Sequence, residues 1–278
     1  MYNNIFIIAD GAITLDVTGF LENIRDDVKR CIVWNCGGAA SLIVFMKCVG
    51  YDYSEMMYKL GRLKCLEALI FGGSIEPGGD KIILEELKKW MTEILEDSRI
   101  FDENSSLKDV YSSFKLFPNF IAYNNGFVNL NPITTPNYTL FDSVLASLVN
   151  YGTFDSYTIF STEYTSFSIH DVFPREHGVY FGKKKNVCYI ANYSICEESG
   201  NVFVNKCQNS LKNVYFRRVM EKIKDYPDVV LINGFNKNKN IDSHKENGKI
   251  HKEMIEKGES TLFKMEEMIE ERNSSKQK

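Results

Sequence analysis

The stretch that decides the fold runs from residue 31 to residue 51 and reads CIVWNCGGAASLIVFMKCVGY. Its first four residues, Cys31–Trp34, form a short apolar run that predicts a buried strand. Small residues follow from Cys36 to Ala40 and predict a tight turn. Ser41–Val49 is almost wholly apolar and predicts a helix that ends at Gly50, a residue suited to the left-handed conformation past a helix end.

A strand, a tight turn and a helix in direct succession are typical of a nucleophile elbow, which lifts an attacking side chain above the edge of the sheet. The pattern G-x-S-x-G places glycines at both outer positions and serine at the apex. Here the outer positions hold Cys36 and Ala40, the inner ones Gly37 and Ala39, and the apex is Gly38. The context of an elbow is present, and the attacking hydroxyl is absent.

The rest of the chain alternates short apolar runs with helical patterns, which predicts an α/β fold with a mostly parallel central sheet. The other predicted strands are Ile5–Ala9, Phe120–Tyr123, Val187–Ala191 and Asp228–Ile232. Predicted helices cover residues 15–27, 55–66 (capped by Asp52 or Ser54), 84–95, a segment that starts at Ser106, and 140–149 after the N-cap Thr139. With no repeat or linker, residues 1–278 are one expected domain, with a core of about residues 4–235 and a docked C-terminal helical segment at 248–272.

The composition excludes several classes of protein. A hydrophobic content of 44% suits a folded domain, and a net charge of -4 argues against a nucleic-acid binder. The seven cysteines lack paired C-x-x-C spacing, so we expect no metal, no cofactor and a reduced, cytoplasmic compartment. The apolar start at Ile5–Ala9 is too short for a signal peptide, and no run reaches the length of a membrane span.

These features resemble the patatin-like phospholipase family, especially its compact bacterial-effector and large-DNA-virus members. In that family a glycine-rich oxyanion loop ends the first strand, where this chain has Ala9, Asp10 and Gly11. The family's G-T-S-A-G elbow falls on Cys36–Ala40, and its Gly-Tyr pair after the helix falls on Gly50 and Tyr51. The resemblance covers nearly all of the chain and implies a three-layer αβα fold.

The second catalytic motif of the family, Y-V-D-G-G-L-L-N-N-F-P, aligns without gaps to residues 164–174 and places the dyad aspartate at Ser166. A competing alignment to D-G-G-x-x-x-N-N-P places it at Asn124. We prefer Ser166, because the family's T-P and A-S landmarks precede the aspartate and here lie at 135–136 and 146–147. Neither position carries a carboxylate.

The resemblance therefore implies a catalytic site that has lost its nucleophile and its base. Gly38 cannot form an acyl-enzyme, and the Ser166 hydroxyl cannot accept a proton as an aspartate would. In the oxyanion loop one glycine remains, and Asp10 adds a negative charge where an anion must be stabilised.

Other groups could replace the lost nucleophile, and each has a simpler interpretation. Cys36 suits a packed small hydrophobe, and Ser41 an inert helix residue. The segment Gly72-Gly73-Ser74 suits a flexible loop, and the adjacent pair His170-Asp171 suits surface polar structure. The run Lys183-Lys184-Lys185 could touch acidic lipid headgroups, but more often such a run is a solvated turn.

We therefore predict a pseudoenzyme that binds a lipid, a membrane surface or a protein partner. The alternatives are a lipid acyl hydrolase with a relocated nucleophile and a structural protein that interacts with a host. The Asn-, Lys- and Ile-rich usage suits an AT-rich genome. The resemblance to the family's compact viral members implies a viral source, in which case the host-cell cytoplasm is the expected location.

Overall fold

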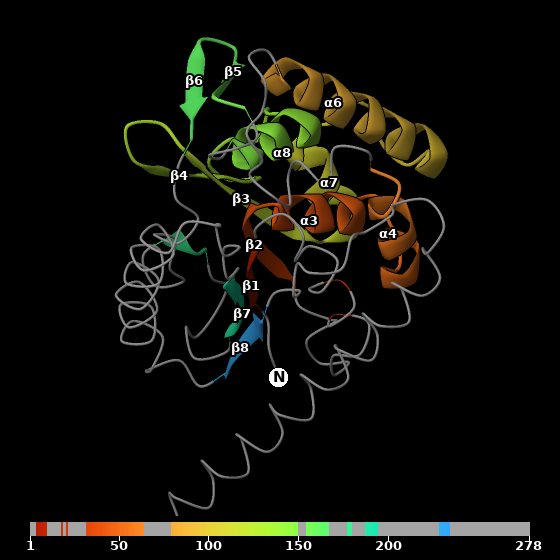
Figure 1. The fold of residues 1–278 in the computed structure, drawn as a ribbon, viewed down its shortest axis with the longest axis vertical. Helices are drawn as coiled ribbons and strands as arrows, with labels where there is room; N and C mark the ends of the chain where they lie inside the picture. The colour runs from red at the N-terminus through yellow and green to blue at the C-terminus, as the bar shows by residue number, and fades with distance from the viewer. Residues whose placement is uncertain are drawn as a thin grey trace, which may run out of the picture.

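The centre of the molecule is a six-stranded sheet with the order β4-β3-β2-β1-β7-β8 (Figure 1). The computed structural model describes residues 4–9, 18, 21, 32–63, 79–149, 154–166, 177–179, 187–193 and 228–233. The strands are β1 (Asn4–Ala9), β2 (Val33–Gly38), β3 (Phe117–Tyr123), β4 (Phe127–Leu130), β7 (Val187–Tyr193) and β8 (Asp228–Asn233). Neighbours are parallel except β3 and β4, which are antiparallel. The predicted α/β class with a mostly parallel central sheet is confirmed.

Helices cover one face of this sheet and share a single apolar core with it. They are α3 (Ala40–Cys48), α4 (Tyr53–Leu60), α6 (Gly79–Ser98), α7 (Leu107–Phe114) and α8 (Leu140–Leu148). On the sheet side, the core takes alternate residues such as Trp34 and Cys36 of β2 and Phe120 of β3. The intervening residues, such as Phe6 and Ile121, are also buried. Burial on both faces explains why these strands appear in the sequence as continuous apolar runs.

Strand β2 differs from its predicted range in a way that matters for the site. The sequence predicts a strand at Cys31–Trp34 followed by a turn from Cys36, but β2 spans Val33–Gly38. It pairs with β3 as far as Cys36 and with β1 as far as Gly38, so the small residues belong to the ladder itself. Pairing with β1 outweighs the turn preference of the two consecutive glycines, Gly37 and Gly38. The turn is reduced to one residue, Ala39.

The helix boundaries also shift. Helix α4 begins at Tyr53 after a reciprocal cap, in which Asp52 Oδ1 accepts from Glu55 N at 2.8 Å and Glu55 Oε2 accepts from Asp52 N at 3.0 Å. This selects Asp52 over Ser54 as the cap. Helix α6 begins at Gly79, five residues before the predicted start, although the sequence suggests a glycine-rich loop there.

A small two-stranded sheet stands beside the main one and was not predicted. It consists of β5 (Ser156–Ile159) and β6 (Thr162–Thr165), joined by a turn in which Phe160 has a positive φ of 53°. The hairpin is fastened to α8 because the Tyr157 hydroxyl donates to Asp142 Oδ1 at 2.6 Å. Its short strands and polar composition give little apolar periodicity, so the sequence offers no strand signal.

The predicted cap at Ser106 is confirmed. Its hydroxyl accepts from Asp109 N at 3.2 Å, while the Asp109 carboxylate accepts from Ser106 N at 2.9 Å, which completes a capping box at the start of α7. These bonds to Ser106 hold the pKa of Asp109 below its usual range.

Ser106→Ala is expected to lower the free energy of unfolding by about 1 kcal/mol, because it removes an N-cap. Urea denaturation at neutral pH measures the change, and Ser112→Ala on the exposed face of α7 is the matched control. Because the folded pKa of Asp109 is lowered, its contribution is present above about pH 4 and is lost as the pH falls through the folded pKa. Equal stability of both variants at pH 7 would contradict the assigned cap.

Several predictions lie outside the described residues. They are the Asp10-Gly11 part of the oxyanion loop, Gly72-Gly73-Ser74, His170-Asp171, Lys183–Lys185 and the C-terminal segment 248–272. In the predicted helix at 15–27, only Thr18 and Leu21 are described, and both are helical and buried.

Candidate functional site

The junction between β2 and α3 has the geometry of an elbow. β2 ends at Gly38, α3 begins at Ala40, and only Ala39 lies between them. Gly38 has φ of 62°, in the left-handed region. A residue with a side chain pays roughly 1–2 kcal/mol to adopt that conformation, and glycine adopts it without strain. The apex therefore has the backbone of a nucleophile turn and no side chain to attack with.

The predicted start of the oxyanion loop lies beside this apex. In the parallel pairing of β1 with β2, Ala9 is the register partner of Gly38, and both residues end their strands. The carboxyl ends of parallel strands form the edge at which open α/β sheets bind their ligands. Strand β1 thus ends next to the apex.

The N-terminus of α3 faces the same edge without a side-chain cap. Its N-cap is Ala39, which cannot accept a hydrogen bond through its side chain, and the first turn holds no acidic residue. The first N–H groups of a helix have no intrahelical acceptor, and the helix dipole favours negative charge near them. The elbow therefore retains an electrostatic preference for an anion.

Small residues let the elbow lie close to its neighbours. A Cβ on Gly37 would lie 3.2 Å from Cδ1 of Ile8 on β1, so a side chain there would displace Ile8. Ala40 is fully buried at the start of α3. The tight packing explains the glycine and alanine content of this segment without any catalytic role.

Neither side chain that could replace the nucleophile near the elbow is accessible. Cys36 is fully buried, and burial raises the pKa of its thiol well above the usual value, more than its bond to Ser41 lowers it. The thiol is therefore protonated at neutral pH. The hydroxyl of Ser41 is also fully buried and donates to Ser147 Oγ at 2.8 Å, while Ser147 donates to Ile121 O at 2.7 Å.

Both candidate positions for the lost aspartate lie on elements that meet. Ser166 is half-buried and directly follows β6. Asn124 directly follows β3, and its Nδ2 donates to the carbonyl of Glu163 in β6 at 2.7 Å. The carboxyl end of β3, the neighbour of β2, is thus joined to the hairpin that leads to Ser166. Among the described residues, no hydrogen bond joins Ser166 to Gly38.

Two solved structures resemble this arrangement. VipD from Legionella pneumophila matches over 95% of this chain and 67% of its own, with a TM-score of 0.53 and 12% sequence identity. The type III effector protein ExoU matches over 95% of this chain and 53% of its own, with a TM-score of 0.50 and 8% identity. Both neighbours are patatin-like. The fold is patatin-like.

At these identities the likeness concerns the fold alone, and the chain spans about half the length of ExoU. No family model matches the sequence. No curated protein matches it either. In the described part of the patatin-like fold, no helix is long and apolar enough to cross a membrane. No group of three or more His, Cys, Asp or Glu side chains suited to a metal occurs there.

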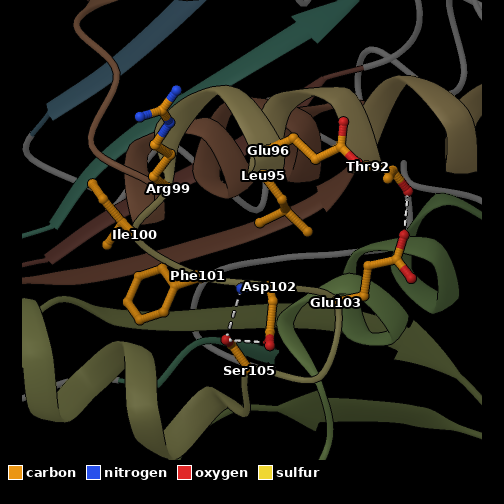
Figure 2. A pocket seen from close by; sticks show the side chains of 9 residues that line it. All are labelled: Thr92, Leu95, Glu96, Arg99, Ile100, Phe101, Asp102, Glu103 and Ser105. Carbon is orange, nitrogen blue, oxygen red and sulfur yellow. Dashed lines mark hydrogen bonds between the residues drawn. The ribbon is translucent and has the colours of Figure 1, made fainter.

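A pocket of about 610 Å³ lies at the C-terminal end of α6 and the turn after it (Figure 2). One of its lining residues, Ile100, lies beside Gly50, past the end of α3 opposite the elbow. Two of its carboxylates are hydrogen-bonded locally. Asp102 Oδ1 accepts from Asn104 N at 3.0 Å and from Ser105 Oγ at 2.8 Å, and Glu103 accepts from the Thr92 hydroxyl on α6. This pocket is separate from the elbow.

A set of buried asparagines on the sheet face opposite α3 was not predicted from the sequence. Asn35, Asn119 and Asn131 are almost completely buried and hydrogen-bonded to one another in series. A signal was available, since Asn35 and Asn119 interrupt the apolar strands Val33–Cys36 and Phe117–Phe120. A polar residue at an inward-facing strand position requires hydrogen-bond partners in the interior.

Proposed function

We propose that this chain is a catalytically inactive member of the patatin-like group, a pseudo-phospholipase whose scaffold binds a lipid, a membrane surface or a protein partner. The observation that carries the proposal is Gly38, which occupies the apex of the elbow with φ of 62° and has no side chain. A serine hydrolase that loses its nucleophile loses roughly 10⁶-fold in turnover. Ser166 and Asn124 add no carboxylate to act as a base.

The burial of Cys36 and Ser41 supports the same conclusion. An attacking group must reach substrate and be deprotonated as it attacks. The Cys36 thiol is buried with a raised pKa, and the Ser41 hydroxyl is committed to Ser147, whose own hydroxyl bonds a backbone carbonyl. Among the described residues, no base is hydrogen-bonded to either group.

The features that the elbow retains favour the binding of a ligand at the carboxyl edge of the sheet. The uncapped N-terminus of α3 favours an anionic group, such as the phosphate or carboxylate of a lipid. The elbow backbone and this helix end are the frame at which the resemblance to patatin-like phospholipases implies a lipid. A lipid is therefore the first ligand to test, ahead of a protein partner.

The purified chain is expected to release no fatty acid from phospholipid vesicles and no nitrophenol from p-nitrophenyl esters above a buffer blank. Gly38→Ala, which also lacks a nucleophile, should give the same baseline. Turnover that scales with protein concentration and vanishes on a single substitution would overturn the proposal. Stoichiometric iodoacetamide labelling of native Cys36 would instead favour a hydrolase with a relocated nucleophile.

Lipid extraction from the purified protein, followed by mass spectrometry, tests the binding half of the proposal. A co-purified lipid that is lost when α3 is given a negative N-cap, as in Ala39→Asp, supports binding at the elbow. Ala146→Ser in α8 is a control at a buried site of similar size. A lipid-free protein would favour a purely structural role.

A further inference from the structure

Three asparagine side chains are buried on the sheet face opposite α3. Asn35 of β2 and Asn119 of β3 are fully buried, and Asn131, which follows β4, is 1% exposed. A buried amide that lacks partners destabilises the folded state, so buried amides are retained where their hydrogen bonds are made. The bonds of these three residues connect parts of the chain that are distant in sequence.

The carboxamide of Asn35 pairs with both backbone polar groups of one residue, Val179. Its Oδ1 accepts from Val179 N at 2.7 Å, and its Nδ2 donates to Val179 O at 3.1 Å. Oδ1 also accepts from Asn119 Nδ2 at 2.9 Å, and Nδ2 also donates to Ile5 O at 3.2 Å. All four hydrogen-bonding positions of the amide are used. The Asn35 side chain thus bonds the backbone of Val179 as a neighbouring strand would.

The series continues away from Val179. Asn119 Oδ1 accepts from Asn131 Nδ2 at 3.0 Å. Asn131 Oδ1 in turn accepts from Ile133 N at 2.9 Å and Thr134 N at 3.0 Å, which orders the turn after β4. A chain of amides therefore runs through the interior from Val179 to the turn at residues 131–134.

The segment that Asn35 holds crosses the sheet. His177 lies with its ring centroid 4.4 Å from that of Phe127 on β4, while Val179 is bound to β2. Residues 177–179, here called the strap, therefore pass over β3, which lies between β4 and β2. In sequence the strap lies between Ser166 and β7, so its position fixes part of the path from the candidate site to the centre of the sheet.

We infer that Asn35 is a latch: the strap docks on the sheet and releases from it as one unit, and its docking is coupled through Asn119 to the turn at 131–134. The two bonds to Val179 form only when the oxygen of the Asn35 amide faces Val179 N and its nitrogen faces Val179 O. Asn119 fixes that orientation by donating to Oδ1. The orientation of Asn119 is fixed in turn by Asn131, which donates to its Oδ1, and by Asn129, whose Oδ1 accepts from its Nδ2 at 2.9 Å. Release of the strap would leave one acceptor position of the buried Asn35 Oδ1 and one N–H of its Nδ2 unfilled, so intermediate positions are disfavoured.

Hydrogen exchange of the Val179 amide tests the latch. Asn35→Leu keeps the side-chain volume and removes both bonds to Val179, so exchange at Val179 is expected to accelerate about tenfold or more. The amides of α7 should keep their wild-type rates, which separates local release from global unfolding. Asn124→Leu is the matched control, because it removes an asparagine bond to the hairpin and touches no part of the series.

The coupling has a separate test. Asn131 has no hydrogen bond to the strap, yet Asn131→Leu is expected to accelerate exchange at Val179 as well, because it removes one of the bonds that fix the orientation of the Asn119 amide. Unchanged exchange at Val179 in folded Asn35→Leu protein overturns the latch, and acceleration confined to residues 131–134 in Asn131→Leu overturns the coupling. If Asn35→Leu does not fold, Val179→Pro removes the same N–H from the strap side. Proteolysis within residues 175–185 must then be faster than in the wild type, or the inference fails.

Discussion

A fluorophosphonate probe is expected to leave the wild-type chain unlabelled and to label a Gly38→Ser/Ser166→Asp double variant at position 38. The elbow supplies the backbone conformation, and the N-terminus of α3 supplies donors for the developing negative charge. What is missing is an oxygen at the apex and a carboxylate to take its proton. A positioned base contributes about 10²- to 10⁴-fold, so the double variant should react at least about 10²-fold faster than Gly38→Ser alone.

Intact-mass spectrometry against time measures the labelling. The control Gly38→Ala/Ser166→Asp carries the same backbone strain at the apex and the same carboxylate, and it should remain unlabelled. A Gly38→Ser/Asn124→Asp variant compares the two alignments, because Asn124 and the Ser166 hairpin are joined in the structure. If both double variants react no faster than Gly38→Ser, neither position faces the apex, and the assigned dyad is wrong.

Trp34→Ala is expected to lower the free energy of unfolding by about 3–5 kcal/mol, the largest effect on stability that we predict. Trp34 is fully buried on β2, in the core that the sheet shares with the helices. The Lys47 ammonium lies 5.9 Å from the centre of its ring, so a cation–π contact is lost together with the apolar area. Strand β2, which ends in the elbow, would lose the packing of this large side chain in the core.

Urea denaturation followed by circular dichroism measures this change. Phe160→Ala is the control for loss of an aromatic ring, because Phe160 is 80% exposed and touches the ring of Tyr138 at 5.6 Å between centroids. That variant should lose less than about 1.5 kcal/mol. Similar losses in both variants would mean that β2 does not form part of the core.

The sequence was sufficient for the strands that consist of continuous apolar runs and for the helices with a clear N-cap. Ile5–Ala9, Val187–Ala191 and Asp228–Ile232 lie in β1, β7 and β8, and the caps at Ser106 and Thr139 are those observed. Each depends on local composition or on one side-chain bond. The end of β2 could not be found in this way, because pairing with β1 extends the strand through Gly37 and Gly38, which favour a turn.

The candidate site was predictable in part for the same reason. The order of strand, apex and helix is local, and it located Gly38 between β2 and α3. The contact of Asn124 with Glu163 spans 39 residues, and the bond of Asn35 to Val179 spans 144. Such pairs depend on how the chain crosses the sheet, and no periodicity in the sequence encodes them.

The short strand β4 also has a consequence for handling the protein at high concentration. An open sheet margin offers unsatisfied amides to a second molecule and can seed aggregates. The edge strand β4 is only four residues long, Phe127–Leu130, and the carbonyl of Asn129 already accepts a hydrogen bond from the Thr134 hydroxyl. A strand from another molecule would find too few free groups there for a lasting ladder.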